Sequence, residues 1–242
     1  MISSPSRSCV IGLALFVWLG VPPIEAIGQV DYEAVRGDRR LQAVRTAAPI
    51  TLDGALDEAA WRDAPVATGF LQSEPNEGEP ASEQTEVRVL YDDANLYIGM
   101  FAHDSSPGDI IVSELKKDFD PGANDAFEVI LDTFHDERNG YRFATNALGA
   151  KWDAQMVNEG RDINSNWDGI WSVQTRIVKT GWYAEIMIPF RTLRFADADP
   201  QTWGLNFLTA SRRACFSTRR CITTPTRGSG ARTSASTSST AR

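Results

Sequence analysis

Residues 125–147 read DAFEVILDTFHDERNGYRFATNA, and this stretch decides the fold. Both arms alternate apolar and polar side chains with a period of two, and the Asn139-Gly140 dipeptide between them favours a tight turn with positive φ. The pattern predicts a β-hairpin. Its expected register places Asp132 opposite Arg142 and Glu128 opposite Asn146.

This hairpin has two chemically different faces. One is expected to pack in the core: Phe127, Val129, Leu131, Tyr141, Phe143 and Thr145. The other is expected to face solvent: Glu128, Asp132, Arg142 and Asn146, around Ile130 and Ala144. Carboxylates, a guanidinium fork and an amide hydrogen-bond well to vicinal hydroxyls, so the polar face could hold a polar ligand. The alternative is an ordinary solvated strand face with one cross-strand ion pair.

The N-terminus has the pattern of a secretory signal peptide. Arg7 precedes an apolar run over residues 10–21, and Pro22 and Pro23 lead to a possible cleavage point after Ala26. The run is too short for a membrane span. Residues 1–26 are therefore predicted to direct export, to the periplasm, the cell surface, the outer membrane or the medium.

The C-terminus changes composition abruptly at Ala214. Residues 214–242 are rich in Ser, Thr, Arg and Gly, and contain five arginines and no carboxylate, so without them the net charge of -8 becomes -13. This composition predicts a disordered low-complexity tail, or a change of reading frame. The folded body before it has no cysteine, which excludes disulfide scaffolds, thiolate zinc sites and a cysteine nucleophile.

Between a linker at residues 27–43 and that tail, the domain is predicted to cover residues 44–213. Short alternating segments separated by turn residues predict a series of short strands. They are expected near residues 50–52, 66–70, 85–91, 96–103, 125–134, 141–147, 151–158, 171–179, 182–188 and 203–210, with a weaker possibility at 110–115. Leu56–Arg62 predicts one short helix whose Trp61 packs onto a sheet. The fold class is an all-β antiparallel sandwich.

The chemistry of the body points to binding rather than catalysis. Its two histidines, His103 and His135, have no evident partner, and no serine stands in a Gly-x-Ser-x-Gly turn. Glu128 and Asp132 would lie about 13 Å apart along a strand, farther than glycosidases place their carboxylates. The acidic body also makes nucleic acid an unsuitable partner. Loop carboxylates offer oxygen ligands for calcium, and the candidates are Asp92, Asp93, Asp104, Asp118, Asp120 and Asp125. The alternative is that these acidic loops are solvated and bind no ion.

Four segments together resemble the carbohydrate-binding module family 9. They are ITLDGALDEAAW at 50–61, VRVLYDDANLYI at 87–98, DAFEVILD at 125–132 and GWYAEIMIPF at 181–190. DTFHDERNGY at 132–141 and NWDGIW at 166–171 are similar to the version found at the N-terminus of secreted bacterial proteins that carry a C-terminal membrane-associated β-barrel. The resemblance covers residues 44–213.

The resemblance implies a CBM9/DOMON-like β-sandwich that binds sugars beside xylan-degrading glycoside hydrolases and holds structural calcium. Characterised members hold a sugar between two tryptophans, assisted by a glutamate, an arginine and an asparagine. Glu128 matches the glutamate, Asn146 is the candidate asparagine, and Arg142 is offset from the arginine. The first clamp tryptophan is replaced by Gly122 and Ala123.

Trp152 and Trp167 are candidates for a substitute aromatic platform, because a flat ring covers the apolar face of a pyranose. For each of them, burial in the core is the alternative. Asp104 matches a position near the family's calcium.

Three functions are retained as hypotheses. The first is a non-catalytic module that binds a xylan- or glucan-type polysaccharide or oligosaccharide for an attached catalytic domain. The second is a structural N-terminal domain of an outer-membrane β-barrel protein. The third is a fragment of an O-glycosyl hydrolase.

Overall fold

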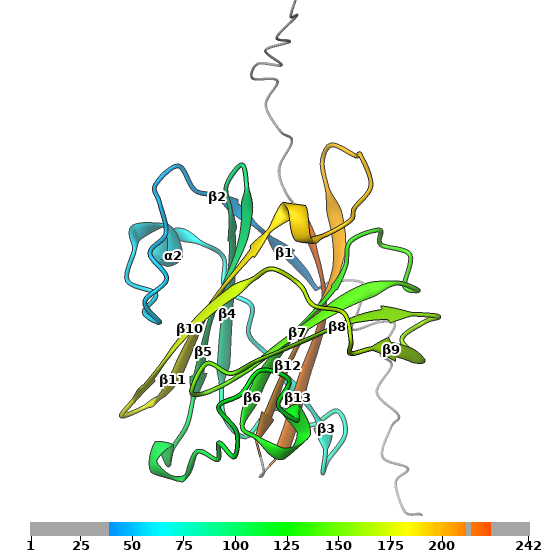
Figure 1. The fold of residues 1–242 in the computed structure, drawn as a ribbon. Coiled ribbons are helices and arrows are strands. Elements are labelled where there is room, and N and C mark those ends of the chain that lie inside the picture. The colour runs from blue at the N-terminus through cyan, green and yellow to red at the C-terminus, as the bar shows by residue number, and fades with distance from the viewer. Residues whose placement is uncertain (1–38, 212–213, 224–242) are drawn as a thin grey trace, which may run out of the picture. The chain divides into compact units, whose positions relative to one another are not determined.

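The computed structural model describes residues 39–211 and 214–223, with side chains from residue 39 to residue 210. The predicted signal peptide and the first part of the predicted linker lie outside these residues. The backbone forms two β-sheets that face each other, with one short α-helix, so the predicted all-β sandwich is confirmed (Figure 1).

The larger sheet has eight strands in the order β1-β13-β12-β6-β7-β8-β9, with β3 also paired to β13. Their bounds are β1 Arg40–Gln42, β3 Leu71–Glu74, β6 Ala126–Asp132, β7 Gly140–Asn146, β8 Lys151–Val157, β9 Asp162–Asn164, β12 Thr202–Ser211 and β13 Ala214–Thr223.

The smaller sheet has five strands in the order β10-β11-β5-β4-β2. The bounds are β2 Val44–Arg45, β4 Thr85–Tyr91, β5 Asn95–His103, β10 Ser172–Val178 and β11 Gly181–Pro189. The helical segments are α2 Ala59–Asp63 and three 3-10 turns, η1 Pro107–Asp109, η2 Pro121–Ala123 and η3 Phe190–Thr192. None of the helices in the described ranges is long and apolar enough to cross a membrane.

The core lies between the two sheets and follows from the period of two. The face of β6 and β7 predicted to be apolar is fully buried at Phe127, Val129, Leu131 and Phe143. These side chains share one cluster with inward-facing residues of the smaller sheet, such as Ile98 of β5. Every second residue of each central strand therefore packs into one apolar core between the two sheets.

The register of the central hairpin differs from the prediction by two residues. Arg142 pairs with Ile130 instead of Asp132, and Asn146 pairs with Ala126 instead of Glu128. An even shift leaves every side chain on its predicted face, so the apolar pattern could not detect the error.

The loop between the two strands explains the shift. Asp132 Oδ1 and Oδ2 accept hydrogen bonds from the backbone N–H groups of Asp136 and Glu137, at 3.2 and 2.7 Å. The positive φ angles fall at His135 and Glu137, and Gly140 is already part of β7. The predicted tight turn at Asn139-Gly140 is therefore wrong: aspartate side chains shape a wider loop instead.

Several other predicted boundaries also differ. No strand covers residues 110–115, and the strand expected at 66–70 is reduced to one bridge, between Ala67 and Val87, before β3 begins at Leu71. An additional strand, β9, lies between the strands expected at 151–158 and 171–179. The predicted helix is shorter, but its Trp61 is 1% exposed and packs against Leu90 and Tyr97, as expected.

The strongest difference concerns the two ends of the domain. Residues 214–223, predicted to begin a disordered tail, form β13 and pair antiparallel with β12. β1, within the predicted linker, runs parallel to β13, and β2 runs parallel to β4. Ladder hydrogen bonds use backbone groups, so a segment without an apolar period can still cover a free sheet edge.

On the outer side of the smaller sheet, a buried carboxylate holds the segment before α2. Glu185 Oε2 accepts hydrogen bonds from the backbone N–H groups of Asp53 and Gly54, at 3.0 and 3.2 Å, and Oε1 accepts one from Trp61 Nε1 at 3.2 Å. Burial raises the pKa of Glu185 to about 7, although these three donors favour the charged form, and the charge of Glu58 raises it further.

This raised pKa predicts that the protein loses stability as pH rises. Between pH 4.5, where an unfolded glutamate titrates, and about pH 7, the native Glu185 binds more protons than the unfolded chain. The free energy of unfolding should therefore fall by about 3 kcal/mol across this window. Urea unfolding at pH 4.5, 6 and 8 measures it. The Glu185→Gln variant should show a flatter profile, and an equal slope in both proteins would contradict the assignment.

Candidate functional site

The candidate site lies on the face of the larger sheet that points away from the core. Alternation along β6, β7 and β8 places Glu128, Arg142 and Trp152 on this outer face, because Phe127, Val129 and Phe143 occupy the inner one. Arg142 pairs with Ala154, and Trp152 pairs with Ala144 on the neighbouring strand. The three candidate side chains therefore form one continuous row across three strands.

Glu128 and Arg142 form an ion pair within this row. Both Nε and Nη2 of Arg142 donate to Oε2 of Glu128, the first at 3.2 Å. The side chains are 10% and 21% exposed, so the pair is largely shielded from water. A carboxylate held by two donors of one guanidinium is a rigid polar unit.

Trp152 extends this unit with an aromatic ring. The Arg142 guanidinium carbon lies 5.1 Å from the centroid of the Trp152 ring, within the range of a cation–π contact. The ring also packs against the cluster formed by Phe119, Ala144 and their neighbours. Carboxylate, guanidinium and ring are thus held in a fixed order on one surface.

This face is less open than the sequence predicted. The segment before β6 folds back over one end of it, so that Phe119 is 1% exposed against Ala126 and Ala144. Glu128 is 7% exposed and Asn146 is fully buried. The expectation of a solvent-facing strand surface is therefore wrong at these two residues, because a long loop covers what the strands alone would expose.

Asn146 has a different setting from its candidate partners. Its Nδ2 donates to the carbonyl of Glu114 at 2.7 Å, and its Oδ1 accepts from the backbone N–H groups of Leu148 and Ala150, both at 3.1 Å. Both ends of the amide are used in joining the covering loop to the turn after β7. Asn146 fixes the border of the face rather than offering groups to a ligand.

Trp167 lies on the other side of the sheet. Its ring is 5.1 Å from Tyr141 and 5.9 Å from Phe143, measured between centroids, and both of those residues face the core. The structure therefore separates Trp167 from Trp152, and the two do not form one aromatic platform.

Sequence reasoning did not reveal which strand completes the face. β12 lies beside β6, where Leu208 pairs with Glu128 and Asn206 pairs with Ile130. Both side chains are half-buried. The alternation of residues 203–210 predicted a strand, but a periodic pattern does not reveal which strand is its neighbour.

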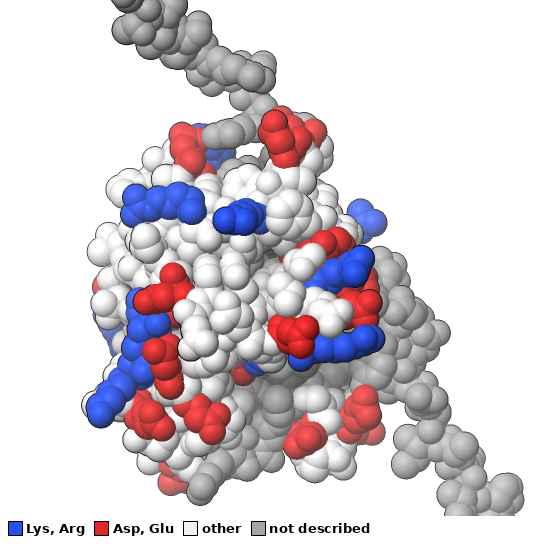
Figure 2. Space-filling view, turned by 45° about the vertical axis from the view of Figure 1, so that its right-hand side comes forward, with Lys and Arg blue, Asp and Glu red and all other residues white. Residues whose placement is uncertain are grey.

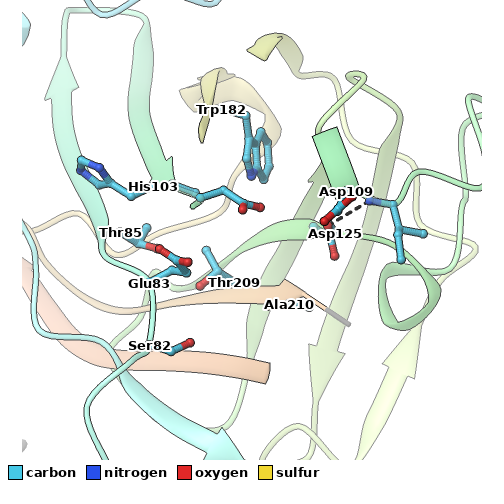
Figure 3. A pocket seen from close by; sticks show the side chains of 13 residues that line it. Ser82, Glu83, Thr85, His103, Asp109, Asp125, Trp182, Thr209 and Ala210 are labelled. Carbon is cyan, nitrogen blue, oxygen red and sulfur yellow. Dashed lines mark hydrogen bonds between the residues drawn. The ribbon is translucent and has the colours of Figure 1, made fainter. Parts of the chain in front are cut away.

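Asp104, the candidate calcium residue, lies elsewhere, beside a cavity of about 100 Å³ between the ends of the two sheets. We call this cavity the end pocket; its walls include Glu83, Asp104, Asp109, Asp125, Trp182 and Thr209 (Figure 3). Across the described residues, no three acidic, His or Cys side chains are arranged so that they could share one metal ion. Calcium binding stays a prediction.

Charged side chains elsewhere are mixed in sign. On the face shown in Figure 2, acidic and basic groups are interspersed around a broad uncharged area, and the visible described residues form no continuous basic surface. The outer-face row matches this pattern, since its one carboxylate and one guanidinium neutralise each other.

The fold and this row together define a β-sandwich with a polar and aromatic outer face. The chain matches the family described as "Carbohydrate family 9 binding domain-like" over residues 52–224, and it belongs to that family. The match includes β13, which the sequence pattern had assigned to a tail.

Solved structures show the same fold at low sequence identity. Two are carbohydrate-binding modules of family 9 from Caldicellulosiruptor kristjanssonii, one in complex with cellotriose and one with glucose. They are 15% and 14% identical, both have a TM-score of 0.54, and the alignments cover 79% and 80% of this chain and 96% and 100% of theirs.

A third similar structure is a proposed carbohydrate-binding protein from Bacteroides uniformis. It has a TM-score of 0.60 at 10% identity, over 77% of this chain and 99% of that one. No curated protein matches the chain.

The hydrogen bonds of Asn146 predict a structural role that unfolding can measure. Asn146→Ala removes three bonds to backbone groups in a buried setting, so the free energy of unfolding should fall by about 3 kcal/mol. Replacing the exposed Asn166 by Ala is the matched control and should change it by less than about 0.5 kcal/mol. Equal, small effects in both variants would show that the amide does not hold the loop.

Proposed function

We propose that this domain is a non-catalytic module that binds a glucan- or xylan-type saccharide on the outer face of its larger sheet. Two observations support the proposal. The chain belongs to the carbohydrate family 9 binding domain-like family. Its Glu128, Arg142 and Trp152 also form one ordered row on an outer sheet face.

The chemistry of the row suits a sugar ring. A guanidinium presents several N–H donors in a fixed plane, and the carboxylate accepts hydrogen bonds, which together match neighbouring hydroxyl groups. An indole ring beside them can cover the apolar face of a pyranose. Because the ion pair is already formed, little side-chain entropy would be lost when a ligand binds.

The expected affinity is weak. The row contains one aromatic ring, since Trp167 lies on the opposite side of the sheet and residues 122 and 123 are Gly and Ala. A single platform with a few hydrogen bonds predicts a dissociation constant on the order of 1 mM. The cellotriose and glucose in the two similar structures make β-linked glucose units the first ligands to try.

The wider setting of the module remains a prediction. We propose that the chain is exported, and that its affinity serves an attached catalytic domain or the remainder of an outer-membrane protein. The predicted signal peptide, on which export depends, lies outside the described residues.

Affinity electrophoresis of the full chain tests the function. Migration should be slowed in gels that contain hydroxyethylcellulose or xylan, and Trp152→Ala should weaken the retardation about tenfold because it removes the ring. Trp167→Phe is the matched control: it keeps an aromatic side chain against the core and should migrate like the parent protein.

Three results would change the proposal. Unslowed migration in every gel would leave a structural or interaction domain as the better function. Equal losses in the two tryptophan variants would place the site elsewhere. Release of reducing sugar from the same polysaccharides by the purified protein would support the hydrolase alternative.

A further inference from the structure

The smaller sheet ends in a long strand with one open edge. β10 stands first in the strand order of this sheet, and it pairs with β11 over all seven of its residues without a bulge (Figure 1). No other strand within residues 39–211 and 214–223 pairs with its second edge. Backbone N–H and C=O groups along such an edge can form a ladder with another strand.

β10 lacks the features that usually protect a sheet edge. The other terminal strands of the two sheets, β1, β2 and β9, have only two or three residues. β10 contains no proline, and its one charged side chain, Arg176, is engaged within the chain. Arg176 Nη2 donates to the carbonyl of Asp53 at 3.1 Å and lies 3.7 Å from Asp53 Oδ2. Short strands, proline and free charges discourage edge pairing, so β10 is open to it.

Apolar side chains beside this edge are exposed. Val173 packs against the core, and Ile177 lies on the same side of the strand but is 42% exposed. The turn after β7 packs against the middle of β10, because a Cβ added to Gly149 would lie 3.4 Å from Thr175 Oγ1. Leu148 in this turn is 54% exposed. A strand added along β10 would cover Ile177 and approach Leu148, which removes apolar surface from water.

The sequence of β10 is complementary to itself. When two copies pair antiparallel about a two-fold axis at Thr175, Val173 of each copy faces Ile177 of the other, which makes an apolar pair. Gln174 faces Arg176, so the one charge meets a neutral amide, and Thr175 faces its own copy. An axis at Arg176 would instead oppose two like charges. The side chains therefore favour a second copy of this strand in one register.

We propose that two copies of this domain associate through β10 and join their smaller sheets into one continuous antiparallel sheet. The two-fold axis relating antiparallel strands is perpendicular to the sheet, so the larger sheets of both copies lie on the same side of the joined sheet. This association does not require saccharide binding.

The geometry has a consequence that rests on the proposed function. With both larger sheets on one side, the two rows of Glu128, Arg142 and Trp152 face in the same direction. A long polysaccharide can then engage two sites at once, which raises the apparent affinity above that of a single weak site.

Sedimentation velocity of the full chain, from about 10 μM to about 1 mM, tests the association. A monomer–dimer equilibrium with a dissociation constant on the order of 100 μM is expected, because a single pair of strands makes a small interface. Over the same range, amide hydrogen exchange should slow within residues 172–178. It should stay unchanged in β5, which is already paired on both edges.

Substitutions at the exposed Gln174 test the register. Gln174→Glu places a carboxylate opposite Arg176 twice in the dimer and should tighten association about fivefold. Gln174→Lys places like charges there and should weaken association by a similar factor. Both effects should shrink at high salt concentration. Gln84→Glu and Gln84→Lys are the matched controls: they make the same charge changes at an exposed position before β4, and they should leave the dissociation constant unchanged.

Three outcomes would overturn the proposal. One is a chain that stays monomeric up to about 1 mM. Another is a dimer in which exchange within residues 172–178 does not slow, which would place the contact on a different surface. The third is an equal shift in both Gln174 variants, or the same shifts at Gln84, which would indicate an effect of net charge. Slowed migration of a strictly monomeric chain in the polysaccharide gels would remove this inference and leave the proposed function intact.

Discussion

The pairing of β6 with β7 and β12 at the centre of the larger sheet is the constraint on which the rest depends. It fixes which residues of three strands share a face, and so it closes the core with Phe127, Val129 and Phe207 on one side. The same pairing brings Glu128 within reach of Arg142 on the other. Because side chains alternate strictly along a strand, the dry interior and the polar row are consequences of one register.

One long segment between β5 and β6 borders both the end pocket and the outer face of the larger sheet. Its first part contributes Asp104 and Asp109 to the end pocket, and its later part places Phe119 over the outer face of the larger sheet. Asn124 and Asp125 hold it in place by accepting hydrogen bonds from the backbone N–H groups of Ser113 and Ile111. A segment with little regular structure thus shapes both surfaces, which is common for loops supported by a rigid sheet scaffold.

The smaller sheet is organised by a different kind of contact. Its outer side is covered by the segment before α2, and that cover is attached through the buried carboxylate of Glu185 and the indole of Trp61. The hydrogen bonds to Glu185 hold this segment in one position on the sheet. Because the pKa of this buried acid is raised, the stability of the domain also depends on pH. The row on the larger sheet is organised by an ion pair instead, in which the guanidinium of Arg142 holds the carboxylate of Glu128.

The sequence alone determined the fold class, the two faces of the hairpin and the inward position of Trp61, because each depends on the local spacing of apolar residues. It also placed Glu128 and Arg142 on one face, and it gave Trp152 as a candidate aromatic platform without assigning it to that face. Tertiary structure decided the register, the neighbours of β12, the strand role of residues 214–223 and the covering of Asn146. It also separated Trp167 from Trp152. The physical reason is that strand pairing and loop placement join residues far apart in the chain through backbone hydrogen bonds, which leave no period in the sequence.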